Sequence, residues 1–272
     1  MPELPEVETI VRGLAQAIPG AKIRRVEVLR PDLIEDETAQ SFARALRGKR
    51  IASVTRRAKN IVTELDGGGY LLVNLGMTGR VLLAGAKDEP PPYLGVRIEL
   101  DRGRVLLYQD ARRFGRLWRM TEEEWRAWEA ALGVEPLSDA FTADFLFDLT
   151  RRSRVAVKTW LMDQARVVGV GNIYASEALF RSGVDPRRPA NELTRDECAR
   201  LRAAVREVLQ ESIDHRGTTF LDYRDLRGEP GAFVRRLRVY DREGEACVAC
   251  GDPIRRVVQG GRSTYFCAHC QR

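Results

Sequence analysis

Two short cysteine motifs, Cys247-Val248-Ala249-Cys250 and Cys267-Ala268-His269-Cys270, decide how the last segment of the chain folds. Sixteen residues separate them, which is enough for a hairpin that gathers four thiolates around one tetrahedral zinc ion. Two disulfides would need an oxidising compartment, and a redox CxxC motif would not need the second pair. All four ligands would be protein atoms, so we predict one structural Zn²⁺ that folds the hairpin without catalysing a reaction.

Two further residues near or outside these motifs could be mistaken for ligands. His269 lies between the last two cysteines, but four thiolates already complete the site. Cys198 falls in an amphipathic helical pattern, where we expect it to be a small packed side chain.

The length and composition of the chain bound its class. With 272 residues it can form two compact domains with sizeable cores. It has no apolar run of 18 residues, and its first residues include Glu3, Glu6 and Glu8 rather than the basic and hydrophobic pattern of a secretory signal. We expect a soluble cytoplasmic protein that does not enter a membrane, and a monomer.

Charge is distributed unevenly along the chain, although the net value is only +6. Residues 42–60 hold seven Lys or Arg and no acid, residues 121–148 hold eight Asp or Glu against one Arg, and residues 233–272 hold eight Arg against four acids. Separate basic segments that converge in space suit a polyanionic partner, and nucleic acid is the first candidate. Solvated faces of an arginine-rich protein are the alternative.

Hydrophobic periodicity predicts a change of architecture midway. Apolar residues from Val7 to Leu14 recur at helical spacing, and Pro19-Gly20 ends that helix. Short alternating runs punctuated by Gly and Pro from Lys22 to Trp118 predict an antiparallel sandwich or barrel. Helices are then predicted over 121–132, 140–150, 155–164, 173–181 and 195–213.

Several motifs together resemble the bacterial formamidopyrimidine-DNA glycosylases, along the whole chain. The motifs are Met1-Pro2-Glu3-Leu4-Pro5-Glu6-Val7-Glu8, Arg56-Arg57-Ala58-Lys59, Leu75-Gly76-Met77-Thr78-Gly79, Asp110-Ala111-Arg112-Arg113-Phe114-Gly115, the stretch 169–180 beginning Gly169-Val170-Gly171-Asn172, Gly261-Arg262-Ser263-Thr264-Tyr265-Phe266 and the four cysteines. Leu4 separates this opening from the related endonuclease VIII branch, which typically has Gly there.

The resemblance implies an α+β fold. It implies a two-layer antiparallel β-sandwich with flanking helices over 1–120, an acidic linker with helices over 121–150, a helix-two-turns-helix domain over 151–232 and a zinc finger over 233–272.

The resemblance also implies a bifunctional glycosylase and abasic-site lyase of base excision repair that attacks through Pro2 after Met1 is removed. An α-amino group with a pKa of about 7.7 to 8.0 is roughly a tenth neutral at pH 7, far more than a lysine amine. Because proline is a secondary amine, its adduct with C1′ is an iminium that withdraws electrons and permits β,δ-elimination. The expected substrates are oxidised purines, 8-oxoguanine and formamidopyrimidines, in duplex DNA.

The family pattern assigns further roles by position. Glu3 would be the general acid or base at the sugar. Glu6 would help to position the damaged base or a water, Lys59 would contact the phosphate near the lesion, and Arg262 would assist the second elimination.

The remaining predicted residues contact DNA. A base inside a duplex must be extruded and its gap filled. By resemblance Met77 and Phe114 fill the gap and Arg112 bonds the orphaned cytosine. Asn172 follows a Gly-x-Gly turn where backbone N–H groups can hold a phosphate. The other expected backbone contacts are Arg154, Lys158 and Tyr240, together with Arg262.

Three positions depart from the family pattern, and two rival functions remain. Asn74 and Tyr93 stand where histidines are usual, with Tyr93 still expected at the DNA, and Leu221 stands where a lysine is common. These departures touch lesion contacts rather than the Pro2 chemistry. The rivals are an endonuclease VIII-like glycosylase for oxidised pyrimidines and a zinc-finger DNA-binding protein without activity.

Overall fold

The computed structural model describes residues 2–272 of the chain, which form two compact units. Unit 1 runs to Ala130 and includes the later segment His215–Ala232, and unit 2 consists of Ala131–Asp214 and Phe233–Arg272. The sequence analysis assigns residues 215–232 to the helical domain, whereas the structure packs them with unit 1. Hydrogen bonds to the N-terminal helix, given below, are the reason.

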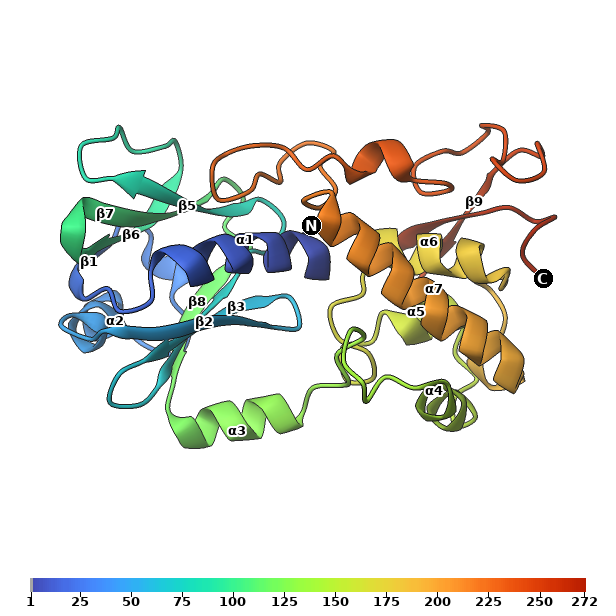
Figure 1. Ribbon diagram of the computed structural model, residues 1–272, viewed down its shortest axis with the longest axis horizontal. Helices are drawn as coiled ribbons and strands as arrows, with labels where there is room; N and C mark the ends of the chain where they lie inside the picture. The colour runs from blue at the N-terminus through green and yellow to red at the C-terminus, as the bar shows by residue number, and fades with distance from the viewer. Residues whose placement is uncertain (1) are drawn as a thin grey trace. The chain divides into compact units, whose positions relative to one another are not determined.

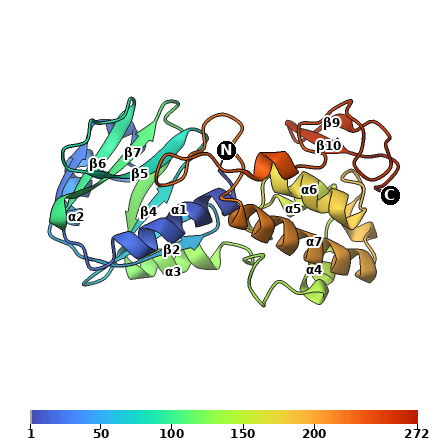
Figure 2. The ribbon, with the colours of Figure 1, turned by 45° about the horizontal axis from the view of Figure 1, so that its top comes forward.

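Unit 1 is a sandwich of two four-stranded antiparallel sheets, as the sequence predicts. One sheet has the order β1-β6-β7-β5 and the other β2-β3-β4-β8 (Figures 1 and 2). The strands are β1 (Ile23–Val28), β2 (Ile51–Arg57), β3 (Asn60–Leu65), β4 (Tyr70–Asn74), β5 (Gly79–Gly85), β6 (Leu94–Leu100), β7 (Arg104–Asp110) and β8 (Arg116–Met120). Apolar side chains that alternate along these strands form the core between the sheets.

Three α-helices belong to unit 1. Helix α1 (Leu4–Ala17) buries Val7, Ile10, Val11 and Leu14, so the predicted N-terminal helix is confirmed. Helix α3 (Glu122–Ala130) stacks Trp125 on Tyr70 of β4, with ring centroids 4.8 Å apart.

The sequence analysis missed helix α2 (Ala39–Leu46), because it expected only strands between Lys22 and Trp118. Its eight residues bury only Phe42 and Leu46, too short a pattern to distinguish from a strand. The hydroxyl of Thr38 caps the helix by accepting a hydrogen bond from the backbone of Ser41.

Unit 2 combines helices with a terminal hairpin. Its helices are α4 (Ala143–Thr150), α5 (Val157–Leu161), α6 (Asn172–Ser182) and α7 (Arg195–Asp214). Helix α5 is shorter than predicted, since Ala156 forms a β-bridge with Pro189 before it and a turn begins after Met162. The 3-10 turns of the chain are η1 (Pro31–Leu33) and η2 (Asp101–Gly103) in unit 1, and η3 (Ala190–Glu192) and η4 (Phe233–Arg236) in unit 2.

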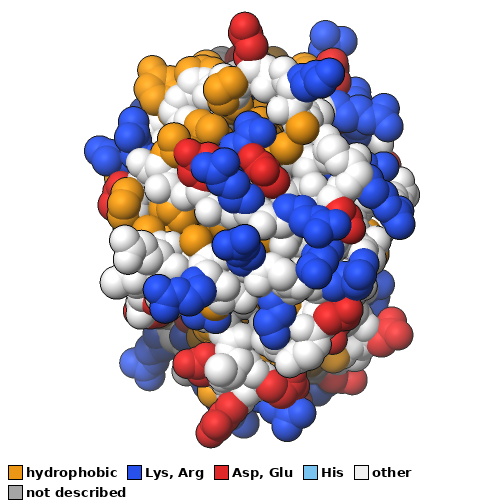
Figure 3. All heavy atoms as spheres, turned by 90° about the vertical axis from the view of Figure 1, so that its left-hand side faces the viewer, with side chains coloured by type: hydrophobic (Ala, Val, Ile, Leu, Met, Phe, Trp, Pro, Cys, Tyr) orange, Lys and Arg blue, Asp and Glu red, His pale blue; other side chains and the backbone are white. Residues whose placement is uncertain are grey.

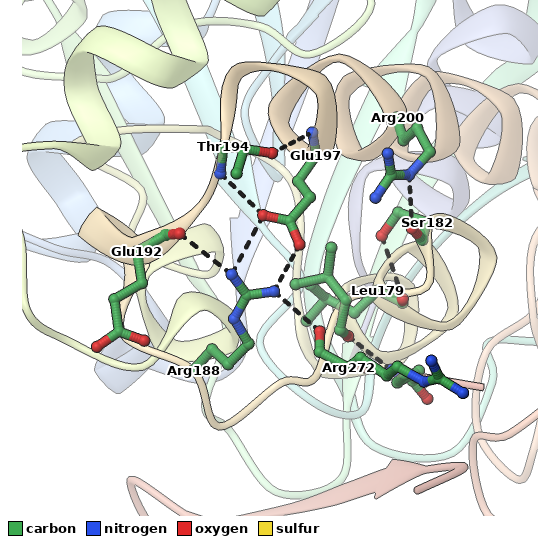
Figure 4. Close-up of polar contacts among 10 residues, drawn as sticks. Leu179, Ser182, Arg188, Glu192, Thr194, Glu197, Arg200 and Arg272 are labelled. Atoms are coloured by element: carbon green, nitrogen blue, oxygen red, sulfur yellow. Dashed lines mark hydrogen bonds and ion pairs between the residues drawn. The ribbon is translucent and has the colours of Figure 1, made fainter. Parts of the chain in front are cut away.

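The hairpin pairs β9 (Arg255–Gln259) with β10 (Arg262–Phe266) in an antiparallel ladder. Its apolar side packs on Phe180 of α6 and on Val239. The chain end is held by Arg188, whose guanidinium donates to the carbonyl of Arg272 at 2.9 Å and to both carboxylate oxygens of Glu197 at 2.6 and 3.1 Å (Figure 4). The hairpin is therefore part of the same folded body as the helices.

None of the helices within residues 2–272 has the length and apolar character needed to cross a bilayer.

Candidate functional site

The predicted nucleophile lies at the start of α1. Pro2 and Glu3 are both buried, and Glu3 is only 2 % exposed. The backbone N–H of Glu3 donates to Glu6 Oε2 at 2.8 Å, and the Glu3 side chain accepts from the backbone of Glu6, which completes a capping box. Two carboxylates are thus fixed directly beside Pro2. Met1, whose removal the sequence analysis expects, lies outside the described residues.

Glu6 also joins α1 to the returning segment 215–232. Its Oε1 accepts a hydrogen bond from the backbone N–H of Thr218 at 2.7 Å. Gly217 has a φ of +82°, and a Cβ there would lie 2.9 Å from that same oxygen, so the close approach needs glycine. One buried carboxylate therefore orders both the first helical turn and a loop more than two hundred residues away.

Tyr223 strengthens this junction. Its hydroxyl lies 3.4 Å from the Glu6 carbonyl, to which it donates. Burial and then the negative charge of Glu6 raise the pKa of Tyr223, so the phenol keeps its proton. Leu221, in the same loop, is 79 % exposed and stays available at the surface.

Lys59 lies in the turn between β2 and β3. Ala58 takes a left-handed conformation there, with φ of 55°. Arg56, whose side chain is 9 % exposed, bonds Glu8 of α1 at 3.0 Å and the carbonyl of Ala58 at 2.9 Å. The turn with Lys59 is therefore tied to the helix that follows Pro2. The sequence analysis gives Glu8 no role in the site, and misses this ion pair.

The three predicted lesion-flanking side chains come from two turns of the sandwich. Met77 lies between β4 and β5, and Arg112 and Phe114 lie between β7 and β8. Met77 is 39 % and Phe114 54 % exposed, so both apolar side chains are available at the surface. The Arg112 guanidinium lies 4.6 Å from the centroid of the Phe114 ring.

Asp110 holds these two turns together, although sequence reasoning gave it no role. Its carboxylate is buried and accepts from the Thr78 hydroxyl at 2.5 Å, from the Gly115 backbone at 2.8 Å and from the Arg112 backbone at 3.2 Å. Thr78 and Asp110 both fall inside motifs quoted above. Their role could not be predicted from the sequence, because it depends on a contact between two turns that are distant in the chain.

Glycines allow the turns to approach closely. A Cβ on Gly76 would lie 2.5 Å from the backbone of Phe114 and Gly115, so any side chain there would push the turns apart. The hydroxyl of Tyr108 donates a hydrogen bond of 3.3 Å to Asp110 Oδ2. Burial, followed by the charge of Asp110, raises the pKa of Tyr108, which keeps it a donor.

The structure shows the surroundings of Asn74 and Tyr93, two of the residues that depart from the family pattern. Asn74 donates to Asn60 Oδ1 at 2.8 Å and accepts from the Gly76 backbone at 2.9 Å, so it shapes the turn with Met77. Tyr93 is 65 % exposed with a φ of 59°, and its carbonyl accepts from the Asp110 backbone at 3.1 Å. It thus lies beside the turn with Arg112.

In unit 2, three predicted residues come together at the start of α6. Lys158 Nζ donates to Asn172 Oδ1 at 2.5 Å, to Thr264 Oγ1 at 2.8 Å and to the Ser263 carbonyl at 3.1 Å. Asn172 Nδ2 in turn donates to the Ser263 carbonyl at 3.0 Å and to the Tyr240 hydroxyl at 3.5 Å. The terminal hairpin and the helix N-terminus are thus joined through one lysine.

Burial changes how Lys158 can act. Its side chain is only 1 % exposed, and its ammonium is surrounded by protein acceptors. Arg262 begins β10 next to Ser263 and is exposed, whereas Arg154 is exposed elsewhere and has no place in this cluster. Lys158 is therefore placed to orient Asn172 and the hairpin, and Arg262 and Arg154 to meet solvent or a ligand.

Glu177 of α6 is a further residue that sequence reasoning missed. It is fully buried, and Oε1 accepts from the backbones of Val239 and Tyr240 at 2.9 Å and of Arg238 at 3.0 Å. Burial raises its pKa, and the three N–H donors oppose that rise. The available signal was the one charged residue within the stretch from Ile173 to Phe180. Glu177 therefore fixes the backbone position of Tyr240.

The four hairpin cysteines fit the predicted zinc. Within the described residues their sulfur atoms all lie within 4.8 Å of one another, with Cys247 and Cys270 at 3.9 Å and Cys250 and Cys267 at 3.5 Å. Four thiolates about 2.3 Å from a tetrahedral Zn²⁺ would lie about 3.8 Å apart. His269 is exposed and pairs with Asp252 at 3.5 Å, so it is not part of this set. The prediction of one structural zinc ion held by four cysteines is confirmed.

Cys198 behaves as expected for a packed side chain. It is buried in α7, with its sulfur 3.8 Å from the hydroxyl of Thr150.

Comparison with known families matches three consecutive parts of the chain. Residues 1–117 match the formamidopyrimidine-DNA glycosylase N-terminal domain, residues 132–223 its H2TH domain, and residues 244–272 the zinc finger found in this glycosylase and in isoleucyl-tRNA synthetase. The order and extent of these matches agree with the sandwich, the helices and the cysteine hairpin.

Curated relatives match over the full length. The chain is 46% identical to a formamidopyrimidine-DNA glycosylase of Xanthomonas campestris pv. campestris strain B100, covering 100% of both chains. It is 43% identical to a protein of the same name from Pelotomaculum thermopropionicum, covering 100% of this chain and 99% of that one.

Solved structures show the same fold. The MutM (Fpg) protein of Thermus thermophilus superposes with a TM-score of 0.89 at 42% identity, covering 99% of this chain and 98% of that one. A Lactococcus lactis Fpg mutant bound to Fapy-dG DNA gives 0.93 at 30% identity, with 100% of both chains covered. Full-length identity of this extent, together with three family matches in the right order, establishes that the chain belongs to the formamidopyrimidine-DNA glycosylases.

Proposed function

We propose that this chain removes oxidised purines, 8-oxoguanine and formamidopyrimidines, from duplex DNA and then cleaves the strand as an abasic-site lyase. The observation that carries the proposal is the buried Pro2 directly before α1, with the carboxylates of Glu3 and Glu6 fixed beside it by the capping box. The named activity of its curated relatives and the Fapy-dG and abasic-site DNA bound by solved relatives support the same reaction.

The chemistry begins with the Pro2 amine, which is a free secondary amine once Met1 has been removed. Its nitrogen bonds to C1′ of the damaged nucleotide while the N-glycosidic bond breaks, and the proton that this nitrogen loses neutralises the departing base. Glu3 gives a proton to the sugar ring oxygen as the ring opens, which leaves an iminium between Pro2 and C1′. The iminium acidifies C2′, so loss of that proton expels the 3′ phosphate, and a second elimination expels the 5′ phosphate.

Three further residues serve these steps. Lys59, in a turn held against α1, contacts the phosphate beside the lesion and lowers the cost of its departure as an anion. Arg262 assists the second elimination. Glu6 holds the loop 215–232 against α1, and through that loop it positions the extruded base or a water.

Met77, Arg112 and Phe114 keep the damaged nucleotide out of the duplex. The two apolar side chains enter the gap, and Arg112 donates to the orphaned cytosine, which suits lesions of guanine. Tyr93 lies beside the same turn and contacts the DNA there.

Asn172, Tyr240, Arg154 and Arg262 bind the phosphate backbone from unit 2, and Lys158 acts through Asn172. The zinc ion bound by the four cysteines stabilises the hairpin from which Arg262 projects. We place the protein in the bacterial cytoplasm, at the nucleoid through its DNA binding, and expect it to act as a monomer.

Borohydride trapping tests the Pro2 chemistry. Reduction of the iminium would leave the intact protein covalently joined to a duplex that contains an abasic site, and the Pro2→Gly variant would lose the adduct. The mass of the mature N-terminus serves as the control, since a retained Met1 would block the amine. An N-terminally processed wild-type protein that fails to trap would leave only the zinc-finger DNA-binding alternative.

Lesion preference separates the two glycosylase branches. We expect faster excision of 8-oxoguanine opposite cytosine than of thymine glycol, measured on matched duplexes under single-turnover conditions. The opposite order would favour the endonuclease VIII-like alternative.

A further inference from the structure

Unit 1 has a second basic surface, formed by one strand and one helix. Arg24, Arg25, Arg44 and Arg47 line a surface hollow of about 510 Å³, together with Val26 and Ala43. All four arginines are exposed. Figure 3 views the side on which β1 and α2 lie, and Lys and Arg side chains spread over much of it. We refer to these six residues as the β1–α2 arginine groove.

A β-bulge explains why two consecutive arginines line one hollow. Successive side chains of a regular strand point to opposite faces. The pairing of β1 with β6 shifts register between Ile23 and Arg25, so Arg24 is an extra residue. A bulge of this kind re-aims a side chain. Ile23 remains in the core at 1 % exposure, while both arginines stay at the surface.

Helix α2 contributes its polar face. Phe42 and Leu46 are buried in the core, whereas Arg44 of the helix and Arg47, the residue that ends it, are exposed. The helix therefore anchors one side in unit 1, and the helix and its C-terminal cap leave two guanidinium groups at the surface.

The positive charge of the groove is hardly neutralised within the protein. The side chains of Arg24, Arg44 and Arg47 make no hydrogen bond or ion pair with any residue in 2–272, and Arg25 has only Glu27 at 3.8 Å. Elsewhere on the unit an arginine can be fully paired, as Arg119 is with both oxygens of Glu37 at 2.8 and 2.7 Å. Unpaired guanidinium groups around a hollow suit a phosphate, which they can bind through two parallel hydrogen bonds.

The groove is separate from the candidate catalytic residues of the unit. Pro2 and Glu3 precede the first turn of α1, whereas β1 follows its last turn. The 14 residues of that helix span about 21 Å at 1.5 Å per residue. Figure 2 shows α2 at the end of the unit away from the start of α1.

We propose that the β1–α2 arginine groove binds the phosphate backbone of a second segment of double-stranded DNA. The groove has no aromatic side chain on which single-stranded bases could stack, which favours an intact duplex. Binding there is independent of sequence and adds to the DNA binding of the proposed function. It lets the protein hold an undamaged segment while the catalytic residues engage another, and so pass between segments without full release.

The double variant Arg44→Ala/Arg47→Ala tests the groove, and alanine at both positions keeps a good helix former in or next to α2. The matched control Lys87→Ala/Arg126→Ala removes the same charge from two other exposed positions of unit 1. Affinity for an undamaged duplex is measured over a range of KCl concentrations. We expect the slope of log affinity against log salt to fall by about 1 to 2 in the groove variant, since each phosphate contact contributes about 0.9. The control should keep the wild-type slope.

A transfer experiment adds a second readout. Wild-type protein bound to one labelled duplex should dissociate faster as unlabelled duplex is added, and the groove variant should lose this dependence. A groove variant with the slope and the competitor dependence of the control would overturn the proposal. Cleavage of a short lesion duplex at saturating enzyme reports on the proposed function separately, because it depends on Pro2 and should stay unchanged in the groove variant.

Discussion

The hydroxyl of Thr78 donates a 2.5 Å hydrogen bond to Asp110 and accepts one of 3.1 Å from the backbone of Arg112. These two contacts connect the turn with Met77 to the turn with Arg112 and Phe114. The side chains proposed to fill the gap in the duplex therefore belong to one connected assembly, although they come from two turns between the sheets that are more than thirty residues apart in the sequence.

Thr78→Val should slow base excision from an 8-oxoguanine duplex by roughly tenfold, because loss of a buried hydrogen bond costs about 1 to 3 kcal/mol. Thr78→Ser keeps the hydroxyl and should remain close to wild type. Trapping on single-stranded abasic DNA should be unchanged in both variants, since no base needs to be extruded. Equal losses on the two substrates would contradict a role in gap filling.

Lys158→Met should weaken duplex binding about tenfold, since Asn172, Ser263 and Thr264 lose their shared donor. The salt dependence distinguishes positioning from phosphate contact. Because Lys158 is buried, the salt slope should stay at the wild-type value, whereas Arg262→Ala should reduce it by about 0.9. A reduced slope in Lys158→Met would show that the ammonium contacts DNA directly. Lys87→Met is the matched control for the charge change.

Glu197→Gln should lower the thermal midpoint at pH 7 by about 2 to 4 °C, the effect of losing roughly 1 kcal/mol from a partly exposed pair. The hydrogen bond from Arg188 holds the pKa of Glu197 below its usual 4.5. A carboxylate with a lowered pKa stabilises the fold above its usual pKa, and this contribution disappears as the pH falls through the lowered value. The difference between wild type and variant should therefore close at acid pH. Glu192→Gln, an exposed neighbour whose carboxylate is not bonded to Arg188, should show no such difference.

Cys267→Ser should abolish binding of the single zinc ion and reduce duplex affinity by at least about a hundredfold, because metal binding supplies the folding energy of such hairpins. Metal content is measured by zinc release with a thiol-reactive reagent, and affinity by titration of a lesion duplex. Cys198→Ser changes the one other cysteine, which is buried in α7, and should retain zinc. Full affinity in a zinc-free Cys267→Ser protein would contradict the role given to the hairpin.

The sequence predicts those parts of the fold whose signal is local. The apolar spacing from Val7 to Leu14 predicts α1, and the cysteine spacing predicts the hairpin, because each depends on residues that are near one another in the chain. Helix α2 could not be predicted, because two buried side chains in eight residues are too few to show the helical period of apolar residues.

The candidate site is less accessible to prediction where contacts join distant segments. Nothing near Thr218 indicates that its backbone bonds Glu6, so the sequence analysis expects the loop 215–232 with the helices, whereas the structure packs it with unit 1. The burial of Lys158 is likewise invisible in the sequence, because the three acceptors that satisfy its charge lie 14, 105 and 106 residues away.

The return of residues 215–232 to unit 1 has a consequence for how the protein is made. The chain passes between the units after Ala130, Asp214 and Ala232, so the segment that completes unit 1 is translated only after the helices up to Asp214. Until Thr218 has left the ribosome, one oxygen of Glu6 has no backbone donor from that loop, and the surroundings of Pro2 stay incomplete. The order of synthesis therefore delays the assembly of the reactive end until the helices that precede residue 215 have been translated.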